Sequence, residues 1–231
     1  GRDGEVVVVS GPTGQGKTTF LQNLTINYHD IEVPSLWFSY EMSPWYLKEK
    51  FVKMGQDKHL LTYAPTDNVE TRLHHVKELI KEAVERKLCK IVFIDHLHYL
   101  IPLSEAKNSS LMIGGILRDL KTMAVETGTI IFLIAHTKKI YQDEELDLSS
   151  IRDSSLISQE ADYVFLIERL KKDKPKVKKK LASVIDKSGT EWTNTAKVTL
   201  AKNRRTGIMV YRKFEVVNHK FIEEQNQDED T

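Results

Sequence analysis

Cysteine is nearly absent from this chain of 231 residues, in which Cys89 is the only one. A single thiol excludes a framework of disulfides within the chain, and this suits a reducing environment inside a cell. Cys89 stands just before the apolar run 91–94. We therefore expect it to be a small buried side chain and not a nucleophile.

An excess of charge of one sign is also missing, because 34 lysines and arginines stand against 33 aspartates and glutamates, for a net charge of +1. The overall charge therefore predicts no nucleic-acid partner, and only a local basic patch could hold one. Long hydrophobic runs are missing too, and none approaches the length needed to cross a bilayer. We recognise no signal peptide, and we expect one intracellular α/β domain without membrane contact.

The most informative segment that is present reads SGPTGQGKTT and begins at residue 10. It matches G-x-x-x-x-G-K-[ST] over residues 11–18, between a valine-rich strand and a helical pattern, which is the expected context for a phosphate-binding loop. Glycines let backbone N–H groups approach phosphate oxygens, and the helix N-terminus favours anions. We expect the lysine to reach the β- and γ-phosphates and the next threonine to ligate Mg²⁺. The predicted nucleotide-binding set is Gly11, Pro12, Thr13, Gly14, Gln15, Gly16, Lys17, Thr18 and Thr19.

Apolar strands and helical patterns alternate along the first two thirds of the chain, which predicts a mostly parallel sheet with helices on both faces. The last third reads as strands joined by turns, and we expect an antiparallel extension of the sheet. The expected strands are 5–9, 36–39, 91–95, 129–135 and 163–167, followed by 182–186, 195–201 and 209–216. Ser43 and Pro44 are expected to cap and begin one helix.

Two carboxylates stand where hydrolysis would need them. Asp95 ends the apolar strand 91–95, and beside the phosphate loop we favour a Mg²⁺ role over that of a helix cap. Glu41 follows the strand 36–39. It could orient and deprotonate water. Alternatively, its negative charge could stabilise the helix that begins near Ser43 by interacting with the positive end of the helix dipole. Spacing alone leaves these alternatives open.

Several segments carry a family resemblance. They read SGPTGQGKTTF, WFSYEMS, IVFIDHLHYL, LIAHTKK, LSSIRDSSLISQEADYVFLIER and AKNRRTG, in this order. The chain resembles the RecA-like motor domain of DnaB-type replicative helicases over nearly its whole length. FSYEMS and IRDSSLISQEAD are the most specific of these segments. The resemblance implies a RecA-like phosphate-loop fold, ATP and Mg²⁺ as cofactors, and a location in the cytoplasm or nucleoid, the mitochondrial matrix or a phage-infected cell.

The resemblance also implies roles for single residues. Glu41 matches the catalytic glutamate, Asp95 the Mg²⁺-associated acid, and His136 a polar sensor of the γ-phosphate. Lys202 and Arg204 match a basic pair that reaches the ATP site of the neighbouring subunit. Arg205 stands beside this pair, so either arginine could act there. A solvent-exposed basic turn is the second interpretation of this segment.

Two loops are expected to face a central channel in this family, around residues 104–110 and 138–152. The first offers Lys107 and Asn108, and the second offers Lys138, Lys139 and Arg152 for the phosphates of single-stranded DNA. The middle of the second loop is acidic, so only its two ends are expected to bind DNA.

The resemblance implies an ATP-driven 5′-to-3′ helicase motor that works as a homo-hexamer in the full-length protein. For this chain by itself, a monomer and a ring are both left open. A primase or helicase loader is the expected protein partner. We expect a motor domain at residues 1–222 and a frayed acidic tail at 223–231. We expect the family's N-terminal domain and docking helix to be missing from the given sequence, which leaves open whether it is an excised motor domain or a natural minimal version. The alternatives are a RecA-like recombination or clock-type ATPase that assembles without unwinding, and a nucleotide-dependent DNA-binding scaffold.

Overall fold

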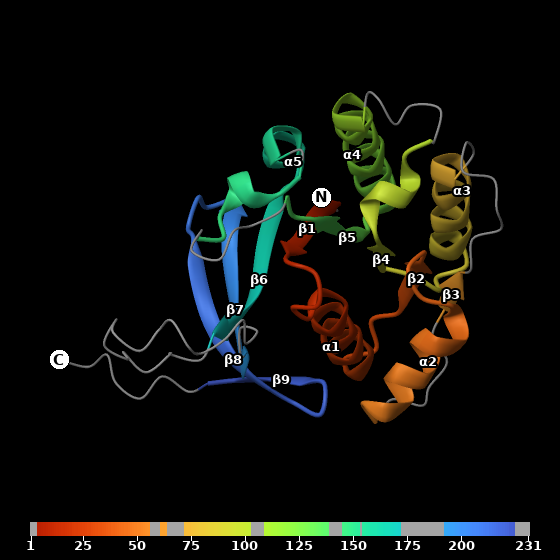
Figure 1. Cartoon of the computed structure of the whole chain (residues 1–231). Coiled ribbons are helices and arrows are strands. Elements are labelled where there is room, and N and C mark those ends of the chain that lie inside the picture. Colours follow the sequence, from red (N-terminus) through yellow and green to blue (C-terminus); the bar gives the residue numbers. More distant parts are fainter. Residues whose placement is uncertain are drawn as a thin grey trace, which may run out of the picture.

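A nine-stranded sheet forms the centre of the protein (Figure 1). The computed structural model describes residues 4–55, 61–63, 72–102, 109–138, 145–152, 154–171 and 192–224. The strand order is β3-β2-β4-β5-β1-β6-β7-β8-β9. The pairs from β3 to β6 are parallel, and those from β6 to β9 are antiparallel. The expected mixed sheet with an antiparallel extension is confirmed.

The strands follow the apolar runs closely. They are β1 (Glu5–Gly11), β2 (Ser35–Ser39), β3 (Leu61–Tyr63), β4 (Ile91–Asp95), β5 (Ile130–His136), β6 (Tyr163–Lys171), β7 (Trp192–Asn203), β8 (Val210–Val217) and β9 (Lys220–Glu223). Strands β3 and β9 were not expected, because each is short and lacks an apolar run. The expected strand at 182–186 lies outside the described residues.

Helices cover both faces of the sheet, and successive residues of a buried strand serve opposite faces. On one face, α1 (Lys17–Asp30) and α2 (Pro44–Lys53) pack on side chains such as Val7 and Phe93. On the other face, α3 (Arg72–Glu85), α4 (Ser109–Thr127), α5 (Ser154–Glu160) and the 3-10 helix η2 (Leu97–Leu100) pack on side chains such as Val8 and Ile94. Both cores are continuous along the parallel strands, so the strand ends that carry the site are held firmly.

Local expectations hold at several positions. Pro44 begins α2, and the Ser43 hydroxyl accepts a hydrogen bond from the Tyr46 amide at 3.3 Å, as an N-cap should. Cys89 is buried, and this burial raises the pKa of its thiol to about 12. Strand β9 ends at Glu223, inside the acidic tail expected at 223–231, and residues 225–231 lie outside the described ranges. Among the helices of the described residues, none has the length and apolarity of a membrane span.

Candidate nucleotide site and adjoining loop

The phosphate loop connects the carboxyl end of β1 to the start of α1, and two glycines are required by its geometry. A Cβ atom at Gly11 would lie 2.1 Å from the carbonyl oxygen of Ile167 on β6, so only glycine fits between these strands. Gly16 has a φ of 98° at the N-cap of α1, in the left-handed region that glycine tolerates best. The first turn of α1 is thereby aimed into the loop, and its free N–H groups can meet an anion.

The ammonium group of Lys17 is enclosed by the backbone of the phosphate loop. Its Nζ donates hydrogen bonds to the carbonyl oxygens of Gly11 at 2.7 Å and Pro12 at 2.9 Å. Burial lowers the pKa of Lys17, while the charges of Asp95 and Glu41 oppose this shift. The loop therefore holds a buried ammonium group, which is suited to phosphate oxygens as partners.

Thr18 and Asp95 form an oxygen pair beside the loop. The Thr18 hydroxyl donates to Oδ2 of Asp95 at 2.8 Å. The other carboxylate oxygen, Oδ1, is buried and has no hydrogen-bond partner within the described part of the chain. Burial, and next the charge of Glu41, raise the pKa of Asp95 to about 6, against the Thr18 hydrogen bond and the charge of Lys17. A hydroxyl and an under-satisfied carboxylate fit the hard oxygen ligands of Mg²⁺.

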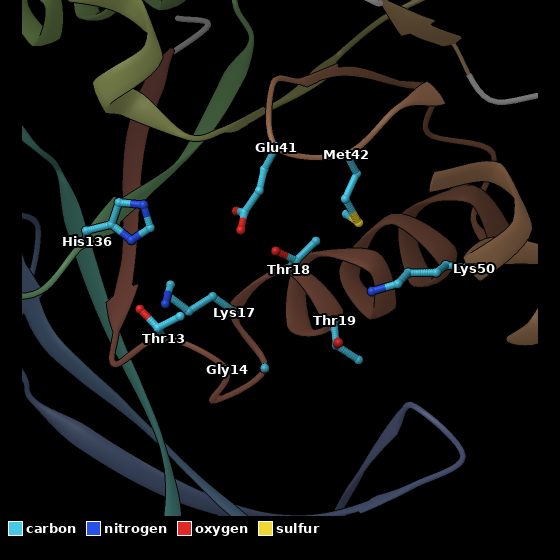
Figure 2. A pocket seen from close by; sticks show the side chains of 10 residues that line it. Thr13, Gly14, Lys17, Thr18, Thr19, Glu41, Met42, Lys50 and His136 are labelled. Atoms are coloured by element: carbon cyan, nitrogen blue, oxygen red, sulfur yellow. The ribbon is translucent and has the colours of Figure 1, made fainter. Parts of the chain in front are cut away.

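Glu41 and His136 complete a cavity of about 270 Å³ over the loop. In Figure 2 the side chains of Glu41, Lys17 and His136 converge on one space, with Thr18 at its edge. Register explains this arrangement: His136 on β5 lies opposite Gly11 on β1, and the residue two before Glu41 lies opposite Asp95. Burial and next the charge of Lys17 lower the pKa of His136, which favours the neutral form of its imidazole.

Sequence reasoning missed Lys50 and Met42, which line the same cavity. Lys50 lies on α2, and its charge opposes the rise that burial causes in the pKa of Asp95. Figure 2 shows its ammonium group directed to the space beside Thr19. Helical spacing from the Ser43 cap predicts which side of α2 bears Lys50, but only the docking of α2 shows that this side faces the loop.

A second cavity, of about 440 Å³, adjoins the other side of the loop. Its walls include Gln15 from the loop, Thr19 from the first turn of α1, Arg169 from β6 and Phe221 from β9. The Arg169 amide donates to the Gln15 side chain at 2.9 Å, and a Cβ at Gly16 would lie 3.5 Å from the Phe221 ring. The antiparallel extension thus contributes one wall next to the phosphate loop, which the sequence did not predict.

The two ends of the loop that follows His136 lie together. Thr137 and Ile151 form an antiparallel bridge, and the Arg152 amide donates to the His136 carbonyl at 3.0 Å. The Lys138 amide donates to the Ser150 carbonyl at 2.8 Å. Lys138 and Arg152 are therefore neighbours at an exposed edge next to His136. The other DNA-binding candidates, Lys107, Asn108 and Lys139, lie outside the described residues.

The basic pair Lys202 and Arg204 does not line the chain's own phosphate cavity. Lys202 Nζ donates to the Ala161 carbonyl at 2.6 Å and also to the Ser158 carbonyl. Arg204 donates to Asp162 Oδ1 at 3.2 Å and to the Gln159 carbonyl. Both side chains thus hold the carboxyl end of α5, where cations are favoured.

Arg205 points elsewhere, since its guanidinium lies 2.7 Å from the Glu5 carboxylate. The two arginines that the sequence left as alternatives therefore have different surroundings. Arg204 follows the end of β7 and lies with Lys202, and Arg205 is tied to the start of β1.

The sequence of this chain matches that of a known protein family. A family model described as the DnaB-like helicase C-terminal domain matches residues 63–222. The matched segment contains Asp95, His136, Lys202 and Arg204, whereas the phosphate loop and Glu41 precede it.

Curated relatives are distant in sequence. The replicative DNA helicase DnaB of Rickettsia conorii is 23% identical over 244 residues, which cover 87% of this chain and 49% of that protein. A probable plasmid replicative DNA helicase of Chlamydia psittaci is 25% identical over 195 residues, which cover 72% of this chain and 43% of that protein. The chain therefore spans about half the length of the curated relatives it matches.

Solved structures share the fold. One of them, described as an ATPase domain, superimposes with a TM-score of 0.74 at 19% identity, over 96% of this chain and 84% of that one. A DnaB-like replicative helicase, solved in a study of its interactions with primase, gives a TM-score of 0.72 at 18% identity. The match covers 94% of this chain and 57% of that chain. The RecA-like arrangement expected from the sequence is confirmed by this likeness.

Proposed function

The chain belongs to the DnaB-like helicase C-terminal domain family, and on this basis we propose that it is the ATP-hydrolysing motor of a replicative helicase. In this proposal, ATP hydrolysis at subunit interfaces drives 5′-to-3′ movement on single-stranded DNA and the unwinding of duplex. The observation that carries the proposal is the convergence of Lys17, Thr18, Glu41, Asp95 and His136 at the carboxyl ends of adjacent strands.

Five side chains at and beside the cavity have a task in this proposed reaction. Lys17 exchanges its two carbonyl partners for oxygens of the β- and γ-phosphates. Thr18 and Asp95 are the residues that would hold Mg²⁺, which when bound neutralises charge on the phosphates. Glu41 orients a water molecule and accepts its proton. The neutral imidazole of His136 contacts the γ-phosphate and responds to its loss.

Lys17→Ala tests the binding step. We expect nucleotide affinity to fall by about tenfold to somewhat over a hundredfold, because a charge-assisted hydrogen bond contributes about 1.5–3 kcal/mol. Titration with a fluorescent ATP analogue measures this. Lys53→Ala is a matched control, since Lys53 on α2 is exposed and pairs with Glu49 at 2.7 Å. Equal affinity in wild type and Lys17→Ala would remove the loop from the proposal.

The exposed edge formed by Lys138 and Arg152 is the proposed contact for single-stranded DNA. Both cations lie next to His136, so a change at the γ-phosphate has a short path to the DNA. The intact set of Lys17, Thr18, Glu41 and Asp95 favours DNA-dependent hydrolysis over a nucleotide-dependent DNA-binding scaffold without activity.

Lys138→Ala and Arg152→Ala test this DNA-binding edge. Each variant should weaken binding to oligo(dT) and reduce the slope of log K against log salt by about 0.7 for every DNA phosphate that the variant no longer neutralises. Fluorescence anisotropy across a salt series measures both quantities. Lys81→Ala, on the outer surface of α3, should change neither. If the slopes of the two edge variants equal that of wild type, this edge does not meet the DNA backbone.

A recombination or clock-type ATPase that assembles without unwinding is the second candidate, because it would use the same phosphate loop and carboxylates. The IRDSSLISQEAD segment, which forms α5 and its approach, favours the helicase. ATPase rates with and without single-stranded DNA, followed by strand separation on a forked duplex, distinguish the two. We propose a homo-hexameric ring for the whole protein, with a primase or helicase loader as its protein partner.

A further inference from the structure

A cluster of aromatic rings packs against His136, the proposed γ-phosphate sensor. The rings of His96 and His136 are 4.0 Å apart, centroid to centroid, at an interplanar angle of 72°. His96 also contacts the Tyr99 ring, at 4.6 Å. Tyr99 in turn stacks on Tyr40 at 5.8 Å and 17°. His98 lies 5.6 Å from both His96 and His136.

The cluster joins three of the strand ends that form the site, those of β2, β4 and β5. His136 ends β5, His96 follows Asp95 at the end of β4, and Tyr40 follows β2. The Tyr40 amide donates to the Asp95 carbonyl at 2.8 Å, and Tyr40 directly precedes Glu41. The row of rings therefore runs from the sensor to the residue beside the proposed general base.

We propose that His96 is a positioning residue, which couples the sensor His136 to Tyr99 and, through the stack of Tyr99 on Tyr40, to the segment that bears Glu41. This inference rests on the proposed function, because it assigns a route by which that same site responds to the γ-phosphate. The coupling is mechanical: the ring of His96 packs against both His136 and Tyr99, so a shift of one ring displaces the next.

The surroundings of the cluster hold Tyr99 and Tyr40 firmly. A displacement of the His96 ring should therefore move this tyrosine pair and not be absorbed by small changes of single side chains. Leu97 and Leu100 are buried and fix η2 in the core, so Tyr99 is carried on an anchored turn. Arg72 of α3 donates to the Tyr99 carbonyl at 2.8 Å, and its guanidinium lies over the rings of both Tyr40 and Tyr99. These contacts hold the tyrosine pair together as one unit.

Burial, and next the charges of His136 and His98, lower the pKa of His96 to about 3. A variant that tests the coupling must therefore alter the ring contacts of His96 with His136 and Tyr99.

The test is NMR on this chain with labelled histidine and tyrosine rings, in ADP and in a non-hydrolysable ATP analogue. In wild type, the His136, His96 and Tyr99 ring signals should differ between the two nucleotides. In His96→Ala, the His136 difference should persist while the Tyr99 difference disappears. His96→Phe, which keeps a ring in place, should retain the Tyr99 difference.

His98→Ala is the matched control, because His98 also packs beside His136, whereas the shorter ring contacts that lead from His136 to Tyr99 run through His96. It should leave the Tyr99 difference intact. A Tyr99 difference that persists in His96→Ala, or is missing in wild type while His136 responds, overturns the coupling. If neither nucleotide shifts any signal, the nucleotide site fails, and with it the proposed function. The His136 response in each variant also shows that the variant is folded and binds nucleotide.

Discussion

Replacing Arg204 by alanine is expected to lower ATP turnover in a ring-forming assembly by roughly three to five powers of ten, while nucleotide affinity stays near the wild-type value. An arginine supplied in trans neutralises charge that develops on the γ-phosphate of the neighbouring site. The mutant subunit keeps its own Lys17, Thr18 and Glu41, so binding survives. Steady-state ATPase rates and fluorescent-nucleotide titration measure the two effects separately.

The structure sharpens this experiment, because Arg204 also contacts Asp162 and the carboxyl end of α5 in its own subunit. A thermal melt of Arg204→Ala therefore reports any loss of stability apart from catalysis, while Lys202 still holds α5. Arg205→Ala is the control, since Arg205 pairs with Glu5. Unchanged turnover in Arg204→Ala and reduced turnover in Arg205→Ala would exchange their roles. Unchanged turnover in both and in Lys202→Ala would leave the trans mechanism without support.

Mixing of variants gives a direct test of action between subunits. Arg204→Ala and Glu41→Gln subunits should each be nearly inactive alone. Together they form some interfaces that pair an intact Glu41 with an intact Arg204, and these interfaces should recover part of the activity. No recovery, in an assembly shown to contain both variants, would argue that the two residues act on the same subunit's ATP.

Glu41→Gln is expected to lower turnover by about two to four powers of ten with nucleotide binding retained, because the amide keeps the size of the side chain and loses the base. Single-turnover hydrolysis measures this step without product release. Glu49→Gln, on α2 and paired with Lys53, is the matched control and should hydrolyse ATP at the wild-type rate. A near-normal rate in Glu41→Gln would contradict the role of general base. It would favour the alternative, in which the charge of Glu41 interacts with the dipole of α2.

Local chemistry was predictable from the sequence alone. The spacing of glycines and of Lys17 and Thr18 specifies a phosphate loop, because each residue's task depends on backbone conformations within ten residues. Buried strands were predictable from their apolar runs, and Ser43 with Pro44 predicted the start of α2. These features are local, so the periodicity and turn chemistry of the chain suffice to predict them.

Strand order and helix docking became visible only in the folded chain. The insertion of β5 between β1 and β4 sets His136 beside Gly11, and it brings His96, which follows β4, against the same ring. No signal in the sequence predicts the wall that Phe221 of β9 adds, nor the capping of α5 by Arg204. Such contacts join segments far apart in the chain, and periodicity states which face of a strand is buried but not which strand or helix will cover it.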